Sequence, residues 1–234
     1  GGSYSTVPFN GWSLKNNISI AFDAVIENVI SGSGADVIVG NSSNNVITGG
    51  AGGDTIDGDA GIDQAVYTEN FTDVSLVKSG NDWNITSGTD IDTLTNIERL
   101  KFNDKYIALD LDGNAGKIIK LLGLILGKDQ STNKEYVGIG LKLLDDGMSY
   151  EQLMQAALDV VLGPNASSLS VVEMIWGNLI GPPTPADNIS QYSALIDNGT
   201  YTSAGLAIVA ADHSLNTTAI DLVGLASTGV DYII

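Results

Sequence analysis

The stretch GGAGGDTIDGDAGID, residues 49–63, combines dense glycine with regularly spaced aspartate. It lies within residues 22–66, which divide into consecutive nonapeptides of one phase, and residues 49–57 fit the repeat pattern G-G-x-G-x-D-x-U-x at every defined position. The eighth residues of these nonapeptides are apolar: Val29, Ile38, Ile47, Ile56 and Ala65. The sixth residues are acids or an amide: Glu27, Asp36, Asn45, Asp54 and Asp63. A shared phase of this kind predicts a repeat architecture.

The pattern explains what the glycines do for the carboxylates. Six residues of each nonapeptide form a turn and three form a short strand, so two nonapeptides complete one coil of a parallel roll. Glycine allows a left-handed or crowded backbone, which lets the carbonyl oxygens of the turn point inward. The sixth side chain adds charge, and Ca²⁺ binds six to eight such hard oxygens. The apolar eighth residue packs inside the roll, so the sequence predicts a calcium-binding β-roll.

Alternate nonapeptides lie on the same side of such a roll, so the turns pair across successive coils. Turn 31–36 faces turn 49–54, with Asp36 and Asp54 as the carboxylates of the first predicted site. Its candidate ligands are Ser31, Ser33, Asp36, Gly49, Gly50, Ala51, Gly52 and Asp54. Turn 40–45 faces turn 58–63, and the candidates there are Gly40, Ser42, Asn45, Gly58, Asp59, Gly61 and Asp63. A further site between turns 22–27 and 40–45 has Glu27 as its acid and no glycine in its first turn.

A flexible linker, a phosphate-binding loop and an ion-free roll fit the glycine-rich stretch less well. A flexible linker does not require an aliphatic residue at every ninth position. A phosphate-binding loop of the form G-x-x-x-x-G-K-[ST] needs a Gly-Lys-Ser/Thr sequence, which the chain lacks. A roll without ions does not require acids at the sixth position. Calcium is therefore the favoured interpretation.

The composition restricts the partners further. The 234-residue chain has a formal net charge of -18, which disfavours nucleic acid and anionic membranes and favours cations. It contains no cysteine, so disulfides, thiolate metal sites and cysteine nucleophiles are excluded. No apolar run reaches the ~20 residues of a membrane span.

The chain changes character after the repeats. DVSLVKS (73–79) and DWNIT (82–86) alternate polar and apolar residues and predict one hairpin, and residues 97–109 predict a second, turning at Asn103 and Asp104. We expect these strands to form an antiparallel sheet that continues and caps the roll. Asp90 and Asp92 are candidate additional calcium ligands, although acids in a turn are more often solvated.

From Asp112 onward the apolar period becomes helical, as at Ile118, Leu121, Leu122 and Ile125. The pattern predicts six or seven short helices up to residue 227, one of them capped by Ser149 and ended by Gly163-Pro164. The segment LDLDGNAG (109–116) does not fit an EF-hand, because Ala115 and Leu121 occupy its glycine and glutamate positions. It predicts instead a helix N-cap at Asp112 or Asn114.

The predicted fold class is therefore mixed: a parallel β-roll with an antiparallel β cap over residues 1–110, followed by an all-helical domain over residues 111–234. Enzymatic motifs are missing from the sequence, since His213 is the single histidine and neither H-E-x-x-H nor G-x-S-x-G occurs. His213 is expected at a surface or a helix end. We expect a non-enzymatic chain.

Residues 17–66 resemble the C-terminal part of serralysin-type secreted metalloproteases, where a similar strand leads into RTX (repeats-in-toxin) calcium-binding repeats. Residues 111–234 resemble a helical domain, of no assigned activity, found after such repeats in type I secretion substrates. The resemblance implies a calcium-binding C-terminal region of a larger secreted bacterial protein, located outside the cell or at its surface, which folds when it binds Ca²⁺. The final residues GVDYII, from Asp231 to Ile234 above all, resemble the tail that a type I exporter reads.

Alternatives implied by the same resemblance are a surface-layer or adhesin segment that self-associates, and the regulatory part of a protease whose catalytic domain lies upstream. A simpler alternative for the final residues is a last strand or a frayed end.

Overall fold

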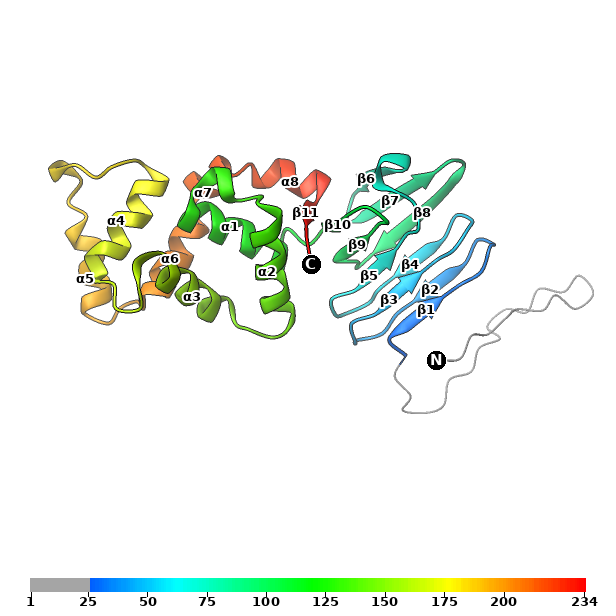
Figure 1. Cartoon of the computed structure of the whole chain (residues 1–234), viewed down its shortest axis with the longest axis horizontal. Helices are drawn as coiled ribbons and strands as arrows, with labels where there is room; N and C mark the ends of the chain where they lie inside the picture. Colours follow the sequence, from blue (N-terminus) through cyan, green and yellow to red (C-terminus); the bar gives the residue numbers. More distant parts are fainter. Residues whose placement is uncertain (1–25) are drawn as a thin grey trace, which may run out of the picture. The chain divides into compact units, whose positions relative to one another are not determined.

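The computed structural model describes residues 26–234. They divide into two compact units, one ending at Tyr106 and the other spanning Ile107–Ile234 (Figure 1). The predicted lead-in strand and most of turn 22–27 lie outside the described residues. The division after Tyr106 lies close to the predicted boundary between residues 110 and 111.

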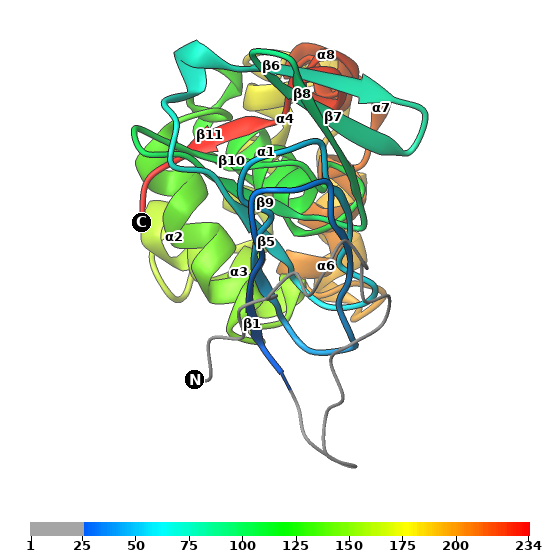
Figure 2. The same ribbon diagram turned by 90° about the vertical axis from the view of Figure 1, so that its right-hand side faces the viewer.

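The first unit begins with the predicted roll. Its short strands are β1 (Asn28–Ile30), β2 (Val37–Val39), β3 (Val46–Thr48), β4 (Thr55–Asp57) and β5 (Gln64–Val66). Three of them pair in parallel with the strand two nonapeptides later, β1 with β3, β2 with β4 and β3 with β5. Viewed along the roll, β1 and β5 lie in one row of stacked strands (Figure 2). Two nonapeptides therefore make one coil, as predicted.

The interior of the roll consists of the eighth residues of the nonapeptides. Ile47, Ile56 and Ala65 are at most 1 % exposed, and Ile38 is also buried. Register pairs Ile38 with Ile56 and Ile47 with Ala65, so each side chain packs on its equivalent one coil away. The middle residue of each strand points inward and its two neighbours point outward, which is the period-two rule of a strand.

The cap contains a short 3₁₀ turn (Phe71–Asp73) and the strands β6 (Ser75–Ser79), β7 (Asp82–Ser87), β8 (Asp90–Thr95) and β9 (Arg99–Lys101). The predicted hairpin of β6 and β7 is present, and β7 also pairs antiparallel with β8. The sequence pattern did not indicate β8 as a strand, nor that β8 pairs in parallel with β4 and β9 with β5. The roll thus continues through β8 and β9 for one more coil, with Leu94 and Leu100 in its interior.

Aromatic side chains lie beyond β5 in the first unit. The rings of Tyr67 and Phe102 stack with centroids 5.3 Å apart, and the ring of Phe71 meets that of Phe102 edge-on at the same distance. Lys105 Nζ lies 4.3 Å from the centroid of the Phe71 ring. Of the three rings only that of Phe102 belongs to a buried residue, with Tyr67 and Phe71 half-buried beside it.

The second unit is built mainly from helices. Their bounds are α1 (Asn114–Leu126), α2 (Lys134–Asp145), α3 (Tyr150–Leu162), α4 (Ser168–Leu179), α5 (Ser190–Asp197), α6 (Ser203–Ala211), α7 (Ser214–Ala219) and α8 (Leu222–Thr228), with 3₁₀ turns at Lys128–Gln130 and Pro185–Asp187. Helix α1 is central, because it contacts α2, α3, α4, α6 and α7. None of the helices in residues 26–234 has the length and apolar character of a membrane-spanning segment.

The helix ends agree with the sequence in one case and differ in another. Ser149 caps α3 and forms a reciprocal capping box with Gln152, as the sequence indicates, and α3 ends just before Gly163. The predicted cap of α1 is wrong: Asp110, rather than Asp112 or Asn114, accepts the N–H groups of Asn114 and Ala115 through Oδ2. The eight helices of residues 107–234 also exceed the predicted six or seven, since the sequence did not resolve the short α7 and α8.

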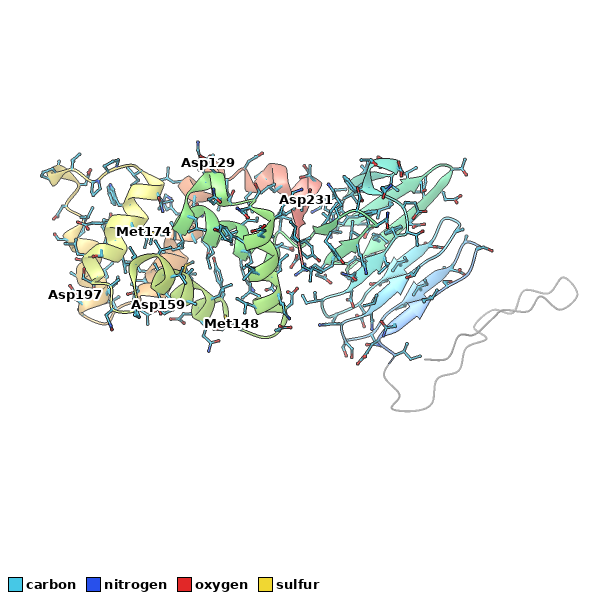
Figure 3. The ribbon with its side chains drawn as sticks, viewed as in Figure 1. Asp129, Met148, Asp159, Met174, Asp197 and Asp231 are labelled. Carbon is cyan, nitrogen blue, oxygen red and sulfur yellow. The ribbon has the colours of Figure 1, made fainter. Side chains whose placement is uncertain are left out.

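The second unit is not entirely helical, because it contains β11 (Val230–Tyr232). The neighbour of β11 in a sheet is β10 (Tyr106–Ala108), whose last two residues also belong to this unit. Val230 and Tyr232 are buried, and Asp231 on β11 forms an ion pair with Lys134 of α2, Nζ to Oδ2 2.8 Å (Figure 3). The N–H of Ile233 donates to the carbonyl oxygen of Lys134. The final residues therefore include a folded strand, which ends at Tyr232.

The interior row of the roll gives a first prediction. Replacing Ile56 by Ala in calcium-containing buffer should lower the free energy of unfolding of the roll by about 2–5 kcal/mol, because the side chain is 1 % exposed and its loss leaves a cavity. Val39→Ala is the control, since Val39 points outward from β2 and is 66 % exposed, and its effect should stay within about 0.5 kcal/mol. Urea unfolding followed by circular dichroism measures both. Equal losses would contradict the assigned interior.

Candidate calcium site

The sixth residues of the nonapeptides form two stacks that run along the roll. In stack A, defined as Asp36, Asp54 and Asp92, the N–H of Asp36 donates to Asp54 Oδ1 and the N–H of Asp54 to Asp92 Oδ1, both at 2.9 Å. In stack B, defined as Asn45, Asp63 and Glu98, the N–H of Asn45 donates to Asp63 Oδ1 at 2.7 Å and that of Asp63 to Glu98 Oε2 at 2.8 Å. One oxygen of each later carboxylate thus binds the backbone of the coil before it.

Asp92 and Glu98 extend these stacks beyond the predicted repeats. Register pairs Thr55 with Thr93 and Gln64 with Arg99, which places Asp92 and Glu98 at the sixth position of the last coil. Asp92 was only a secondary candidate in the sequence, and Glu98 was missed. A signal was present, because DTLT (92–95) and ERLK (98–101) match positions six to nine of the repeat, an acid followed by x-U-x.

The second carboxylate oxygens of Asp54 and Asp63 are the unusual feature. Asp54 Oδ2 and Asp63 Oδ2 are buried and have no hydrogen-bond partner, and the two residues are 1 % and 0 % exposed. Burial is the main cause that raises the pKa of Asp54, and it raises the pKa of Asp63 to about 6. A buried carboxylate oxygen without a donor is costly unless a cation or a proton neutralises it. These atoms are therefore the strongest sign of ion binding.

Asp36 and Asn45, the first members of the two stacks, differ from Asp54 and Asp63 because both of them have hydrogen-bond donors within their own turns. Asp36 Oδ2 accepts from Ser31 Oγ and from the N–H of Gly32, within its own turn. Asn45 Oδ1 accepts from the N–H of Asn41 at 2.9 Å. The structure therefore stacks Asp36 on Asp54, as the sequence predicts, but the unsatisfied charge lies on Asp54 and Asp63.

Glycine is required where the turns close around these oxygens. A Cβ on Gly49 would overlap Asp54 Oδ2, and one on Gly58 would lie 2.6 Å from Asp63 Oδ2. Gly50 and Gly52 have φ values of +97° and +107°, and a Cβ on Gly50 would overlap the carbonyl oxygen of Gly32 in the facing turn. The glycines thus allow both the left-handed backbone and the close approach of the two turns.

The remaining predicted ligands lie in the same turns. The Ala51 N–H donates to the Gly32 carbonyl at 3.2 Å, joining the two turns that carry Asp36 and Asp54. Ser33 and Ser42 are exposed, as is Asp59, whose N–H donates to Asp57 Oδ1. Gly40 lies against Asn45 Oδ1, and a Cβ on Gly61, which has φ +137°, would lie 3.0 Å from the Ser43 carbonyl oxygen.

Two asparagines that were not among the predicted ligands also hold the turns together. Asn41 Oδ1 accepts the N–H of Ser43, and its Nδ2 donates to the carbonyl oxygen of Ile26. Asn44 Oδ1 accepts the N–H of Ile62 at 2.9 Å, which bridges turn 40–45 to turn 58–63. Both asparagines occupy repeat positions at which the pattern is undefined or asks for glycine, so the pattern does not indicate them.

The donor set fits calcium. Within residues 26–234, histidine, cysteine, aspartate and glutamate side chains form no cluster of three or more suited to a metal ion. A cation bound beside Asp54 Oδ2 or Asp63 Oδ2 would find backbone carbonyl oxygens of the closely stacked turns as further ligands. Calcium accepts such mixed oxygen ligands in flexible geometry. The arrangement defines a parallel β-roll whose turns are built for hard cations.

The family comparison agrees with this class. Residues 30–65 match the family described as RTX calcium-binding nonapeptide repeat, in four copies, and the repeats of this family bind calcium. These residues are therefore RTX repeats, as the sequence predicts. A solved structure titled extracellular lipase LipA from Serratia marcescens is similar over 34 % of this chain and 16 % of that one, with 18 % identity and a TM-score of 0.24. No curated protein sequence matches the chain.

The buried charge of Asp63 gives a prediction for the calcium-free chain. Its pKa is raised in the folded state, from an ordinary value of 3.8 to about 6, so the folded roll binds more protons than the unfolded one between these values. Stability of the calcium-free roll should therefore rise as the pH falls from 7.5 to 5. Circular dichroism in a chelator should show β signal returning on acidification. Asp63→Asn should show more β signal at pH 7.5 and a smaller gain with acid. An unchanged or falling signal in the parent chain would contradict the assignment.

Proposed function

We propose that the RTX roll is a calcium-dependent folding module of a larger secreted bacterial protein. The observation that carries the proposal is the pair of buried carboxylate oxygens, Asp54 Oδ2 and Asp63 Oδ2, that have no partner in glycine-rich turns. Calcium bound there supplies positive charge and accepts oxygen ligands from both facing turns. The residues of the chain hold the turns in place through the hydrogen bonds of stacks A and B.

Electrostatics couples ion binding to folding. The chain carries a formal net charge of -18, and the roll brings Asp54 close enough to Asp36 and Asp90 that their charges raise its pKa further. Without cations, forming the stacks requires buried negative charges in register, which is unfavourable. Binding free energy then becomes folding free energy, because the assembled turns do not exist in the unfolded chain. Extracellular calcium modules commonly bind in the range of about 10⁻⁴ to 10⁻³ M.

The same coupling supports a route through a type I exporter. A roll that stays unfolded at low calcium and folds outside the cell suits export of an unfolded chain, and the RTX match supports an extracellular location.

A non-enzymatic role is part of the proposal. It is supported by His213, which serves as the N-cap of α7, its Nδ1 accepting the N–H of Leu215 at 3.2 Å.

We place the export signal at the end of the chain. Ile233 and Ile234 follow the buried Tyr232 and are 52 % and 77 % exposed, so two large apolar side chains face solvent next to β11. They resemble the apolar ending of type I substrates. Because they are exposed in the folded chain, these two side chains can be changed without removing the buried residues of the preceding strand.

The folding proposal predicts a selective response to a chelator at pH 7.5. Removing calcium should reduce the β signal of the roll, while the helical signal of residues 114–228 persists, because α1 and its neighbours have an apolar core of their own. Circular dichroism during calcium titration measures both signals. A spectrum that is the same in millimolar calcium and in chelator would rule out coupled folding.

The export proposal needs a variant that preserves the fold. Deleting residues 231–234 would also remove Tyr232 and the Lys134–Asp231 ion pair, so we prefer Ile233→Ser with Ile234→Ser. In cells carrying the matching exporter, this variant should reach the medium well below the parent level while binding calcium normally after purification. Val223→Ser, at a residue 86 % exposed on α8, is the matched control and should be exported normally. Export of the double variant at the parent level would move the signal elsewhere.

A further inference from the structure

Stack B ends in a segment outside the RTX match. The match stops at residue 65, yet Glu98 occupies the sixth position of the following coil and Asn96 begins its turn. We propose that a calcium ion binds between turn 58–63 and residues 96–98, held by Asp63 Oδ2, the carbonyl oxygen of Asn96 and the charge of Glu98. This inference rests on the proposed calcium-binding function of the roll and adds a site that the repeat pattern does not contain.

The backbone of the two coils has the same arrangement on either side of turn 58–63. The N–H of Gly40 donates to the carbonyl of Asp57, and the N–H of Gly58 donates in the same way to the carbonyl of Thr95. Asn96 therefore occupies the first position of its turn, one coil after Gly58, just as Gly58 occupies the first position one coil after Gly40. The strands agree, because the N–H of Gln64 donates to the Asn45 carbonyl and that of Arg99 to the Asp63 carbonyl.

The oxygen atoms beside the first residue of each turn have the same arrangement in both coils. A Cβ on Gly40 would overlap both Asn45 Oδ1 and the carbonyl oxygen of Gly58. A Cβ on Gly58 would overlap the carbonyl oxygen of Asn96 and lie 2.6 Å from Asp63 Oδ2. In each case a side-chain oxygen of one coil and a carbonyl oxygen of the next converge beside the glycine that begins the turn. Residues 96–98 thus present an oxygen where a repeat turn would.

The hydrogen bonds of Asp63 determine on which side the ion lies. Its Oδ1 accepts the N–H of Asn45, toward turn 40–45. Its Oδ2 has no donor and lies beside Gly58, where the Asn96 carbonyl also approaches. The free oxygen and full burial of Asp63 therefore point to a ligand at this end of the turn. A proton donor would satisfy one oxygen, whereas a cation satisfies Asp63 Oδ2 and the Asn96 carbonyl together.

Asn96 is held in a conformation that keeps this carbonyl in place. It has a left-handed backbone, with φ +50°, and its Nδ2 donates to Asp57 Oδ1 at 2.8 Å. Glu98 is anchored from the other side, since its Oε2 accepts the N–H of Asp63. The turn has three residues, 96–98, in place of the six in 58–63, which explains why a pattern of fixed length does not detect it.

The test is calorimetric titration of the whole chain with Ca²⁺ at pH 7.5, comparing the parent with Glu98→Gln. The glutamine keeps an oxygen to accept the Asp63 N–H but removes the charge, so one calcium equivalent should disappear or weaken by about tenfold or more. Asp73→Asn is the control, because it removes one charge from an exposed residue of the same unit. Circular dichroism in excess calcium should show that both variants fold like the parent.

A second measurement does not depend on that variant. Coordination of the Asn96 carbonyl should shift the amide ¹⁵N resonance of Ile97 on calcium addition in the parent, and this shift should be lost in Glu98→Gln at calcium levels that fill the remaining sites. Equal stoichiometry and affinities in Glu98→Gln and Asp73→Asn, or an Ile97 shift unaffected by Glu98→Gln, would overturn this site alone. Absence of any calcium binding by the parent would instead refute the proposed function.

Discussion

The structure of the roll depends on one interaction, the hydrogen bond from the backbone N–H of a sixth residue to the side-chain oxygen of the sixth residue one coil later. The bond recurs from Asp36 to Asp54 and from Asp54 to Asp92, and again in stack B. It sets the register of the strands and satisfies backbone donors inside closely packed turns. It also fixes carboxylates in buried positions, so the bond that aligns the coils creates the charge that must be balanced.

The glycine content follows from the same constraint. Stacked turns approach so closely that a Cβ at Gly49, Gly50 or Gly58 would overlap an oxygen atom. This close approach of the turns brings carbonyl oxygens of two turns together, and a cation can bind these oxygens without a cluster of acidic side chains. The same crowding buries Asp54 Oδ2 and Asp63 Oδ2 away from any hydrogen-bond donor of the chain. The tight stacking of the turns therefore both requires glycine and creates the positions at which a cation can bind.

Much of the roll could be predicted from the sequence, because the nine-residue phase specifies both the interior row and the stacks. The pattern did not reveal the last coil, since β8 and β9 are joined by a turn of three residues and Glu98 replaces aspartate. The helical unit shows a similar limit. The periodicity located α1, but LDLDGNAG contains two acids, and the pattern does not show that Asp110 rather than Asp112 accepts the first N–H groups of the helix. The final strand β11 depends on a partner, β10, far away in sequence, which no local pattern indicates.

Hydrogen exchange at the backbone amides of Asp36, Asn45, Asp54 and Asp63 tests the central claim most directly. These four N–H groups donate to the stacked side chains, whereas amides within α1 report on the other unit. The account predicts slow exchange of all four in calcium and rapid exchange in chelator at pH 7.5, with α1 protected in both. Equal protection of the four amides with and without calcium would contradict it.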